Sequence, residues 1–202
     1  LRNRTKRQLE IENEWIYDLR QKSVRFVRGN LKSKINKSKI GMVHYRILFI
    51  VNPISGFGLG WEIPYRIRHI AAYKDIEYNI RFTEYAGHAK EIVEQAKHQN
   101  YTHIIAAGGD GTVNEIGTAL INTGIAFGVI SLGSGNGFAR HLGFSQMMNK
   151  ALKQILKSET TDIDVVEING HYSLNVSGFG FDAEVAHFFS RMKIRGIFSY
   201  IY

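Results

Sequence analysis

The sequence predicts an α/β protein in which a parallel sheet has helices on both faces, followed by the start of an antiparallel β-sandwich domain. Three observations lead to this prediction. Short apolar runs without strict alternation are separated by segments of helical periodicity, which is typical of parallel strands buried on both faces. A glycine-rich loop follows three of these runs. After Thr160 the pattern changes to two strand-like runs joined by an Asn-Gly pair, the strongest short-range signal for a β-hairpin.

The composition of the 202-residue chain excludes several classes of protein. There is no cysteine, which rules out a disulfide scaffold and a Cys-ligated metal site and favours a reducing compartment. A hydrophobic content of 44% is enough for a real core. No apolar run reaches the ~18 residues of a membrane-spanning helix, and the N-terminus lacks the apolar stretch of a signal peptide. We therefore expect a cytoplasmic protein.

The net charge of +8 lies entirely in residues 1–42, which carry 12 Lys and Arg against 4 Asp and Glu. Apolar positions in this segment fit a helical stripe, so we expect a helix over 8–27, followed by a lysine-rich stretch. Two interpretations stay open. The segment is either an extension upstream of a start at Met42, or a basic appendage that is attracted to anionic lipid.

The rest of the chain divides into two units. Residues 43–160 form the α/β domain, and residues 161–202 begin a β-rich second domain that is incomplete, because about 40 residues are too few for an independent core. The expected strands of the first unit are 46–51, 78–83, 103–107 and 125–131. Its expected helices are 61–73, 87–99, 113–122 and 145–157. The second unit opens with a hairpin of strands 164–168 and 171–176.

The three glycine-rich loops are 52–60 (the first loop), 108–112 (the second loop) and 133–137 (the third loop). An open parallel sheet binds its ligand at the carboxyl ends of its strands, where these loops lie. Glycine lets backbone N–H groups approach an anion, and the helix after the second loop adds its positive dipole end. One such loop alone would be an ordinary βα connection. Three at one edge predict a nucleotide site, although the lysine of a P-loop is absent.

Asp110 stands between glycines at the end of a strand and just before a helix. A carboxylate there would repel phosphate unless it binds Mg²⁺ or a substrate hydroxyl, so magnesium or acceptor positioning is one role. Capping its own helix is the other, since Asp is favoured at that position. Glu115, in the first turn of the same helix, is favoured by the dipole without any function.

Four motifs carry a resemblance to a known family. They are NPISG over 52–56, Thr83, GGDGTVNE over 108–115 and LGSGNGFAR over 132–140. In this order they resemble the diacylglycerol kinase catalytic domain, a family that includes sphingosine kinases and the soluble bacterial lipid kinases. The resemblance implies ATP-dependent phosphorylation of a lipid hydroxyl such as that of diacylglycerol, with Mg²⁺. It places the nucleotide between the α/β domain and a β-sandwich domain.

The resemblance also implies roles for individual residues. In this sequence Arg140 matches the closing arginine of the third motif; the alternative is a surface residue on a short helix. GFGFDAE over 178–184 resembles the segment that opens the second domain, with Asp182 and Glu184 either near the lipid cleft or capping a hairpin-to-helix connection. No residue matches the general base, which we expect beyond Tyr202. The residues matched to nucleotide contacts are Asn52, Ser55, Gly56, Thr83, Gly108, Gly109, Asp110, Gly111, Thr112, Asn114, Glu115 and Ser134.

Two alternatives to a lipid kinase remain. NAD kinases of the same superfamily also carry GGDGT at a strand end, but Asn114 and Glu115, together with the third motif, favour lipid kinases. A nucleotide-binding fragment without catalysis is consistent with the missing base. We expect a lipid substrate, peripheral membrane contact through residues 1–42 and no nucleic-acid partner, because no RNA- or DNA-binding motif accompanies the basic segment. A homodimer is left open.

Overall fold

The computed structural model describes residues 23–28, 45–157, 159–168 and 170–174. The proposed second-domain segment 178–184, with Asp182 and Glu184, lies outside them, as does most of the helix expected over 8–27. In chain order the elements are β1 (Ser23–Arg28), β2 (Arg46–Val51), η2 (Leu59–Glu62), α2 (Ile63–His69), η3 (Ala71–Tyr73), β3 (Glu77–Phe82), α3 (His88–Ala96), β4 (His103–Gly108), α4 (Asp110–Ala119), β5 (Ala126–Ser131), α5 (Gly137–His141), α6 (Met148–Ile155), β6 (Glu159–Asp164), β7 (Val166–Ile168) and β8 (His171–Ser173).

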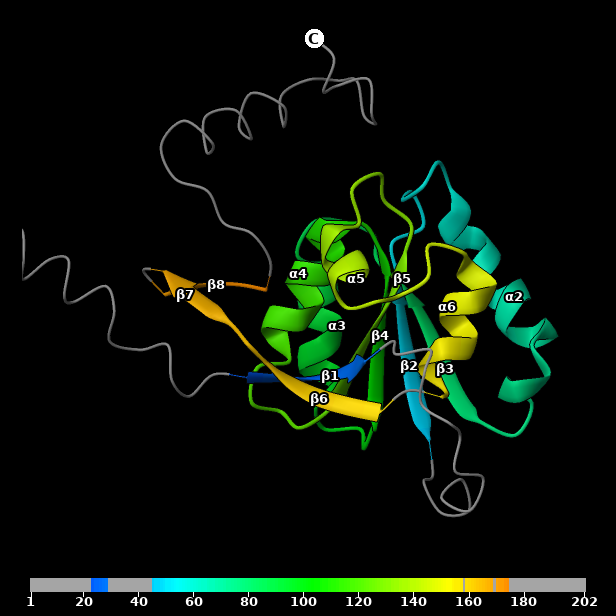
Figure 1. Cartoon of the computed structure of the whole chain (residues 1–202), viewed down its shortest axis with the longest axis horizontal. Coiled ribbons are helices and arrows are strands. Elements are labelled where there is room, and N and C mark those ends of the chain that lie inside the picture. The colour runs from blue at the N-terminus through cyan, green and yellow to red at the C-terminus, as the bar shows by residue number, and fades with distance from the viewer. Residues whose placement is uncertain (1–22, 29–44, 158, 169, 175–202) are drawn as a thin grey trace, which may run out of the picture.

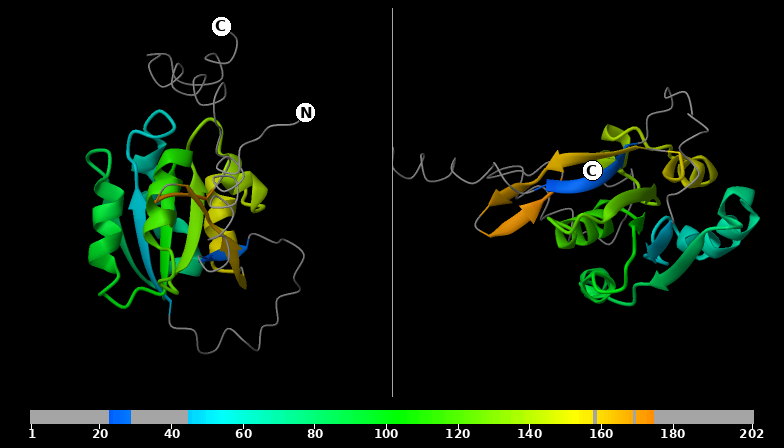
Figure 2. Two further views of the ribbon diagram at one scale, coloured as in Figure 1. Left: turned by 90° about the vertical axis from the view of Figure 1, so that its left-hand side faces the viewer. Right: turned by 90° about the horizontal axis from the view of Figure 1, so that it is seen from below.

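A six-stranded sheet in the order β3-β2-β4-β5-β1-β6 forms the centre of the molecule. Its first five strands are parallel, and β6 runs antiparallel to β1. Helices α3 and α4 cover one face, while α2 and α6 cover the other (Figures 1 and 2). Every residue of β4 and β5 is buried, as their apolar runs predict for strands covered on both faces. The predicted α/β architecture is confirmed.

Strand β1 corrects the sequence-based expectation of a helix over 8–27. Residues Ser23–Arg28 are extended and lie between β5 and β6. Val24 and Phe26 are buried while Arg25 between them is exposed, which is the period of two of a β-strand. The apolar residues of this strand also fit the helical stripe that the sequence suggested. The Phe26 ring makes edge-to-face contacts with the rings of Phe127, Phe138 and Phe144, at centroid distances of 5.2–5.8 Å. Part of the segment expected to be an extension therefore belongs to the core.

The end of the α/β domain also differs from the expectation. Strand β6 joins the main sheet through all six of its residues, whereas the strand expected in this region begins only at Asp164. Its residues are mostly polar and exposed, as suits an edge strand. The hairpin predicted next is confirmed. Strands β7 and β8 are antiparallel, and Ile168 pairs with His171 across a two-residue turn in which Gly170 has φ +78°.

The observed helices begin or end at residues other than those expected. The segment 61–73 breaks into η2, α2 and η3, because Ile70 is extended and ends α2. Helix α4 begins at Asp110 rather than at residue 113. The expected helix over 145–157 is α6, and the separate short helix α5 precedes it. Within the described ranges, none of the helices has the length and apolar character needed to cross a bilayer.

His103 is the first residue of β4, at the end of the strand opposite the glycine-rich loops, and only 8% of its surface is exposed. Its ring lies beside the ring of Tyr45, and its Nδ1 is 2.9 Å from the hydroxyl of Thr102. Burial lowers the pKa of His103 from 6.5 to about 4, because the charged imidazolium would lose its hydration. The folded protein therefore holds a neutral imidazole here at pH 5–6.

We predict that Phe26→Ala lowers the free energy of unfolding by about 3–5 kcal/mol, through the lost burial of the ring and the cavity that it leaves. Urea unfolding followed by circular dichroism would measure the change. Arg25→Ala is the matched control in the same strand. Its exposed ion pair with Asp162, at 3.7 Å, is worth less than about 1 kcal/mol. If the two variants lose equal stability, β1 does not belong to the core.

We predict that stability falls as the pH drops from about 6.5 to about 4. Over this range the unfolded chain binds a proton on His103 that the folded protein does not, so the loss approaches about 3 kcal/mol. The His103→Gln variant does not titrate at this position and lacks this part of the pH dependence. Urea midpoints at several pH values would measure the difference, with His98→Gln at an exposed site as the control. Parallel profiles for wild type and His103→Gln would contradict the prediction.

Candidate functional site

The structure brings the three glycine-rich loops to one edge of the sheet, at the top of Figure 1. Backbone hydrogen bonds align the strand ends from which the loops leave. The N–H of Asn52 donates to the carbonyl of Ala107, and that of Leu132 donates to the carbonyl of Gly108, both at 2.9 Å. Thr83 joins the same edge, since its N–H donates to Val51 at 2.9 Å. The parallel register therefore places all four strand ends side by side.

Two glycines allow the loops to touch through their backbones. A Cβ on Gly133 would lie 2.8 Å from the Cα of Gly109, so any side chain would push the second and third loops apart. A Cβ on Gly56 would lie 2.5 Å from the carbonyl oxygen of Leu132, and its φ of +62° suits glycine. The first loop is thus pressed against the start of the third. The three loops form one contiguous backbone surface.

The N-terminus of α4 opens onto this surface. Gly109 is its N-cap residue, and no side chain caps the helix from that position. A Cβ on Gly111 would meet nothing within 4 Å, so there is free space beside the first turn. Uncapped N–H groups and the positive end of the helix dipole favour an anion there. The nearby Thr112 is buried, and its hydroxyl oxygen accepts a hydrogen bond from the side-chain amide of Asn52 at 3.3 Å.

Asp110 is the first residue of α4, yet its carboxylate reaches the neighbouring helix. The N–H groups of Gly137 and Phe138 at the start of α5 donate to its two oxygens at 3.4 Å. These distances are long for hydrogen bonds, so the carboxylate retains acceptor capacity. Of the two roles expected for Asp110, the capping role is present, but Asp110 caps the neighbouring helix α5 rather than its own helix α4. Magnesium binding at the remaining lone pairs stays compatible with this geometry.

Asn136, which was not among the residues expected at the site, organises the third loop. It is buried in the left-handed conformation, with φ of 53°. Its Oδ1 accepts the N–H of Gly133 at 2.9 Å, and its Nδ2 donates to the carbonyl of Gly133 and to Gln146. The signal was present in the sequence, since Asn between glycines is the residue other than Gly that best tolerates φ > 0.

Asn114 and Glu115 were expected to contact nucleotide, and here both tie α4 to its neighbours. The Oδ1 of Asn114 accepts the N–H of Leu174, which follows β8, at 3.1 Å. A carboxylate oxygen of Glu115 accepts the N–H of Lys90 in α3 at 3.3 Å. Asn114 thus links the helix of the second loop to the residue that follows β8.

The remaining expected residues differ in their exposure. Ser55 is half-buried, and its N–H donates to the carbonyl of Asn52. The side chains of Ser134 and Arg140 are exposed at the third loop and on α5, and neither makes a hydrogen bond or ion pair with a described residue. Ser131 ends β5 one residue before Leu132, and its buried hydroxyl has no hydrogen-bond partner within the described part of the chain. This orphaned hydroxyl is a further polar group at the same sheet edge that sequence reasoning missed.

The described residues contain no group of three or more His, Cys, Asp or Glu side chains that could hold a metal ion by themselves. A magnesium ion at Asp110 would therefore need ligands from a bound phosphate group and from water, which is how Mg²⁺ is usually held at phosphate sites. One carboxylate beside an uncapped helix N-terminus is a donor set that fits this mode. The residues present are thus compatible with Mg²⁺ bound together with a nucleotide.

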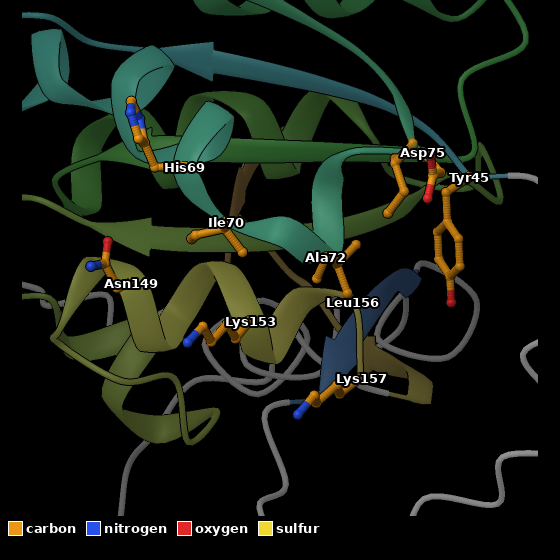
Figure 3. A pocket seen from close by; sticks show the side chains of 10 residues that line it. Tyr45, His69, Ile70, Ala72, Asp75, Asn149, Lys153, Leu156 and Lys157 are labelled. Carbon is orange, nitrogen blue, oxygen red and sulfur yellow. The ribbon is translucent and has the colours of Figure 1, made fainter.

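A cleft of about 870 Å³ lies elsewhere, between α2–η3 and α6 (Figure 3). None of the residues expected at the nucleotide site lines it, whereas His69, Asp75, Lys153 and Lys157 do. A ligand at the three loops would rest on an open edge rather than in this cleft. The large cleft and the predicted site are therefore separate features.

Residues 46–168 match the sequence profile of the diacylglycerol kinase catalytic domain. The chain is 36% identical, over 110 residues, to the "Probable lipid kinase YegS-like" of Klebsiella pneumoniae (strain 342), covering 52% of this chain and 37% of that protein. A solved diacylglycerol kinase structure from Bacillus anthracis strain Sterne has 31% identity and a TM-score of 0.58, covering 64% of this chain and 46% of that one. A second structure from the same strain has a TM-score of 0.61 and 26% identity over 76% of this chain and 58% of that one.

The chain thus spans under two fifths of the curated relative and about half of the solved structures. The match covers every strand of the central sheet except β1, together with all three glycine-rich loops. The sequence profile, the relatives and the shared fold agree with the motifs at the sheet edge: the chain belongs to the diacylglycerol kinase catalytic domain family.

Proposed function

We propose that the chain binds ATP with Mg²⁺ at the three-loop edge, and that the whole protein transfers the γ-phosphoryl group to a lipid hydroxyl such as that of diacylglycerol. One observation carries the proposal. The N-terminus of α4 has no side-chain cap and opens between two loops whose backbones touch at Gly109 and Gly133, so its first-turn N–H groups are left available at the edge. Such a surface suits phosphate oxygens.

The charges at this edge support magnesium as part of the ligand. The three loops contain no Lys or Arg, while Asp110 adds a negative charge beside the helix N-terminus. Metal-free ATP would meet repulsion from this carboxylate, whereas Mg²⁺ between the phosphates and Asp110 would turn the repulsion into attraction. When bound, the ion would neutralise charge on the transferring phosphoryl group. The role of the chain's own residues is to position the phosphates through backbone donors.

A lipid acceptor is supported by the names of the relatives, of which one is a probable lipid kinase and one a diacylglycerol kinase. No residue of this chain is assigned as the general base. We therefore expect the chain to bind nucleotide and the whole protein to carry out transfer. The hydrogen bond from Leu174 to Asn114 supports a coupling between the α/β domain and the second domain that we expect after it. Helix α4 begins at the second loop and also contacts Leu174, which follows β8.

We predict that Asp110→Asn weakens binding of Mg-ATP about tenfold or more and leaves the binding of metal-free ATP unchanged or tighter. The amide keeps the size of the side chain and one acceptor oxygen for α5, but it loses the charge that attracts the metal. Isothermal titration with and without Mg²⁺ measures both affinities. Asp75→Asn, an exposed site at the distant cleft, is the matched control. Equal losses with and without metal would remove Asp110 from the metal site.

We predict that the whole protein, given radiolabelled ATP together with diacylglycerol, other lipid alcohols and NAD, labels a lipid. Thin-layer chromatography separates the products. Label only in NADP would favour a NAD kinase instead. Label in neither product, with ATP binding intact, would leave a nucleotide-binding protein without kinase activity.

A further inference from the structure

Four exposed apolar side chains lie close together in the sequence, in the segment that begins at the three-loop edge. They belong to Ile54, Phe57, Trp61 and Tyr65, whose exposed fractions are 69%, 100%, 62% and 67%; we call this set the apolar tip. Its residues lie on the first loop, on η2 and on α2, in the segment that leaves the top of β2 in Figure 1. Because the tip starts two residues after Asn52, it projects from the same edge of the sheet as the proposed nucleotide site.

The backbone of the apolar tip is tightly folded. Successive turns are closed by hydrogen bonds from the N–H of Gly58 to Ser55 and from that of Trp61 to Gly58, at 3.1–3.2 Å. The Trp61 ring packs against Phe82 of β3 with its centroid 4.7 Å away. Phe57 has φ of 58°, a conformation that a bulky residue seldom adopts. The fold thus holds this ring fully exposed, in a position where glycine or asparagine would be the local choice.

Helix α2 continues the surface as an amphipathic element. Ile63 and Ile67 are buried in the core, while Tyr65 and Arg68 are exposed on the outer side. The Arg68 side chain makes no ion pair or hydrogen bond with any residue that the structure describes, whereas Arg66 is paired with Glu62. The outer surface therefore carries aromatic rings followed by an unpaired cation. This order suits an interface in which rings enter the hydrocarbon boundary and a cation meets anionic headgroups.

We propose that the apolar tip docks this protein on an anionic lipid bilayer, with Ile54 and Phe57 inserted and Trp61 and Tyr65 at the headgroup boundary. The proposal rests on the proposed lipid-kinase function, because a lipid acceptor must be reached in a membrane. A bilayer fits better than a protein partner for two reasons. The tip is a projecting turn that lines no part of the cleft in Figure 3, and the cation beside its rings, Arg68, has no ion-pair partner among the described residues.

This docking surface differs from the membrane contact expected through residues 1–42. Attraction through the lysines and arginines of that segment is electrostatic and fades as salt is added. Insertion of apolar side chains is not screened, so part of the binding should persist at high salt. Salt dependence and substitution in the tip therefore separate the two contacts.

The experiment uses the full chain carrying Trp15→Phe, which leaves Trp61 as the only tryptophan. Vesicles contain phosphatidylcholine and phosphatidylglycerol in equal parts, with and without brominated acyl chains. We expect the Trp61 emission to shift to shorter wavelength and to be quenched by the brominated lipid. In the same background Phe57→Asn, which suits φ of 58°, should keep the fold and lower vesicle affinity about tenfold. Val166→Ser removes an exposed apolar side chain on β7 and is the matched control.

The proposal is overturned if Trp61 is not quenched, if Phe57→Asn binds vesicles like its parent, or if salt abolishes all binding. Self-association that Phe57→Asn abolishes, with vesicle binding unchanged, would assign the tip to a second copy of the chain. Loss of Mg-ATP affinity in this variant would place the ring against the nucleotide instead. Vesicle binding without kinase activity would refute the proposed function alone. Activity on lipid in detergent micelles, without binding to vesicles, would refute the docking surface alone.

Discussion

The backbone contact between Gly109 and Gly133 governs the arrangement of the whole sheet edge. Strands β4 and β5 are parallel and in register, with Gly108 opposite Ser131, so the loops that follow them leave the sheet side by side. They can do so only because neither loop carries a side chain at the contact. The start of α4 is thereby left open between them. A methyl group at position 133 would separate the loops and change the opening onto the start of α4.

The strands that could be predicted from the sequence are those with both faces buried. Strands β2, β4 and β5 are covered on both faces, so their apolar runs and the glycines that follow were sufficient. Strand β1 was missed because its apolar residues also fit a helical stripe, and the choice depends on partners about a hundred residues away. Strand β6 was missed because an edge strand has a polar pattern, of which Ile163 is the only strongly apolar member.

The candidate site also has features that could be predicted from the sequence and features that could not. Glycines report directly on backbone geometry, so the three loops were predictable from sequence alone. Side-chain roles were not, because an oxygen that looks available for a ligand can instead accept an N–H from a distant segment, as Asn114 does from Leu174. The converse holds for Asn136, whose structural role depends on Gly133 and Gln146 being in place. Contacts between residues that are distant in the sequence decide which polar groups remain free for a ligand.

The central place of β1 has a consequence for how the protein folds during synthesis. Phe26 pairs with Phe127, and Ser23 pairs with Asp164, so the earliest described strand finds both of its neighbours only after residues 127 and 164 have left the ribosome. Until then its apolar residues and its unpaired backbone are exposed to other chains. Such long-range pairing slows folding and favours aggregation of intermediates. Chaperone dependence of the nascent chain should therefore centre on residues 23–28 and end when β6 is released.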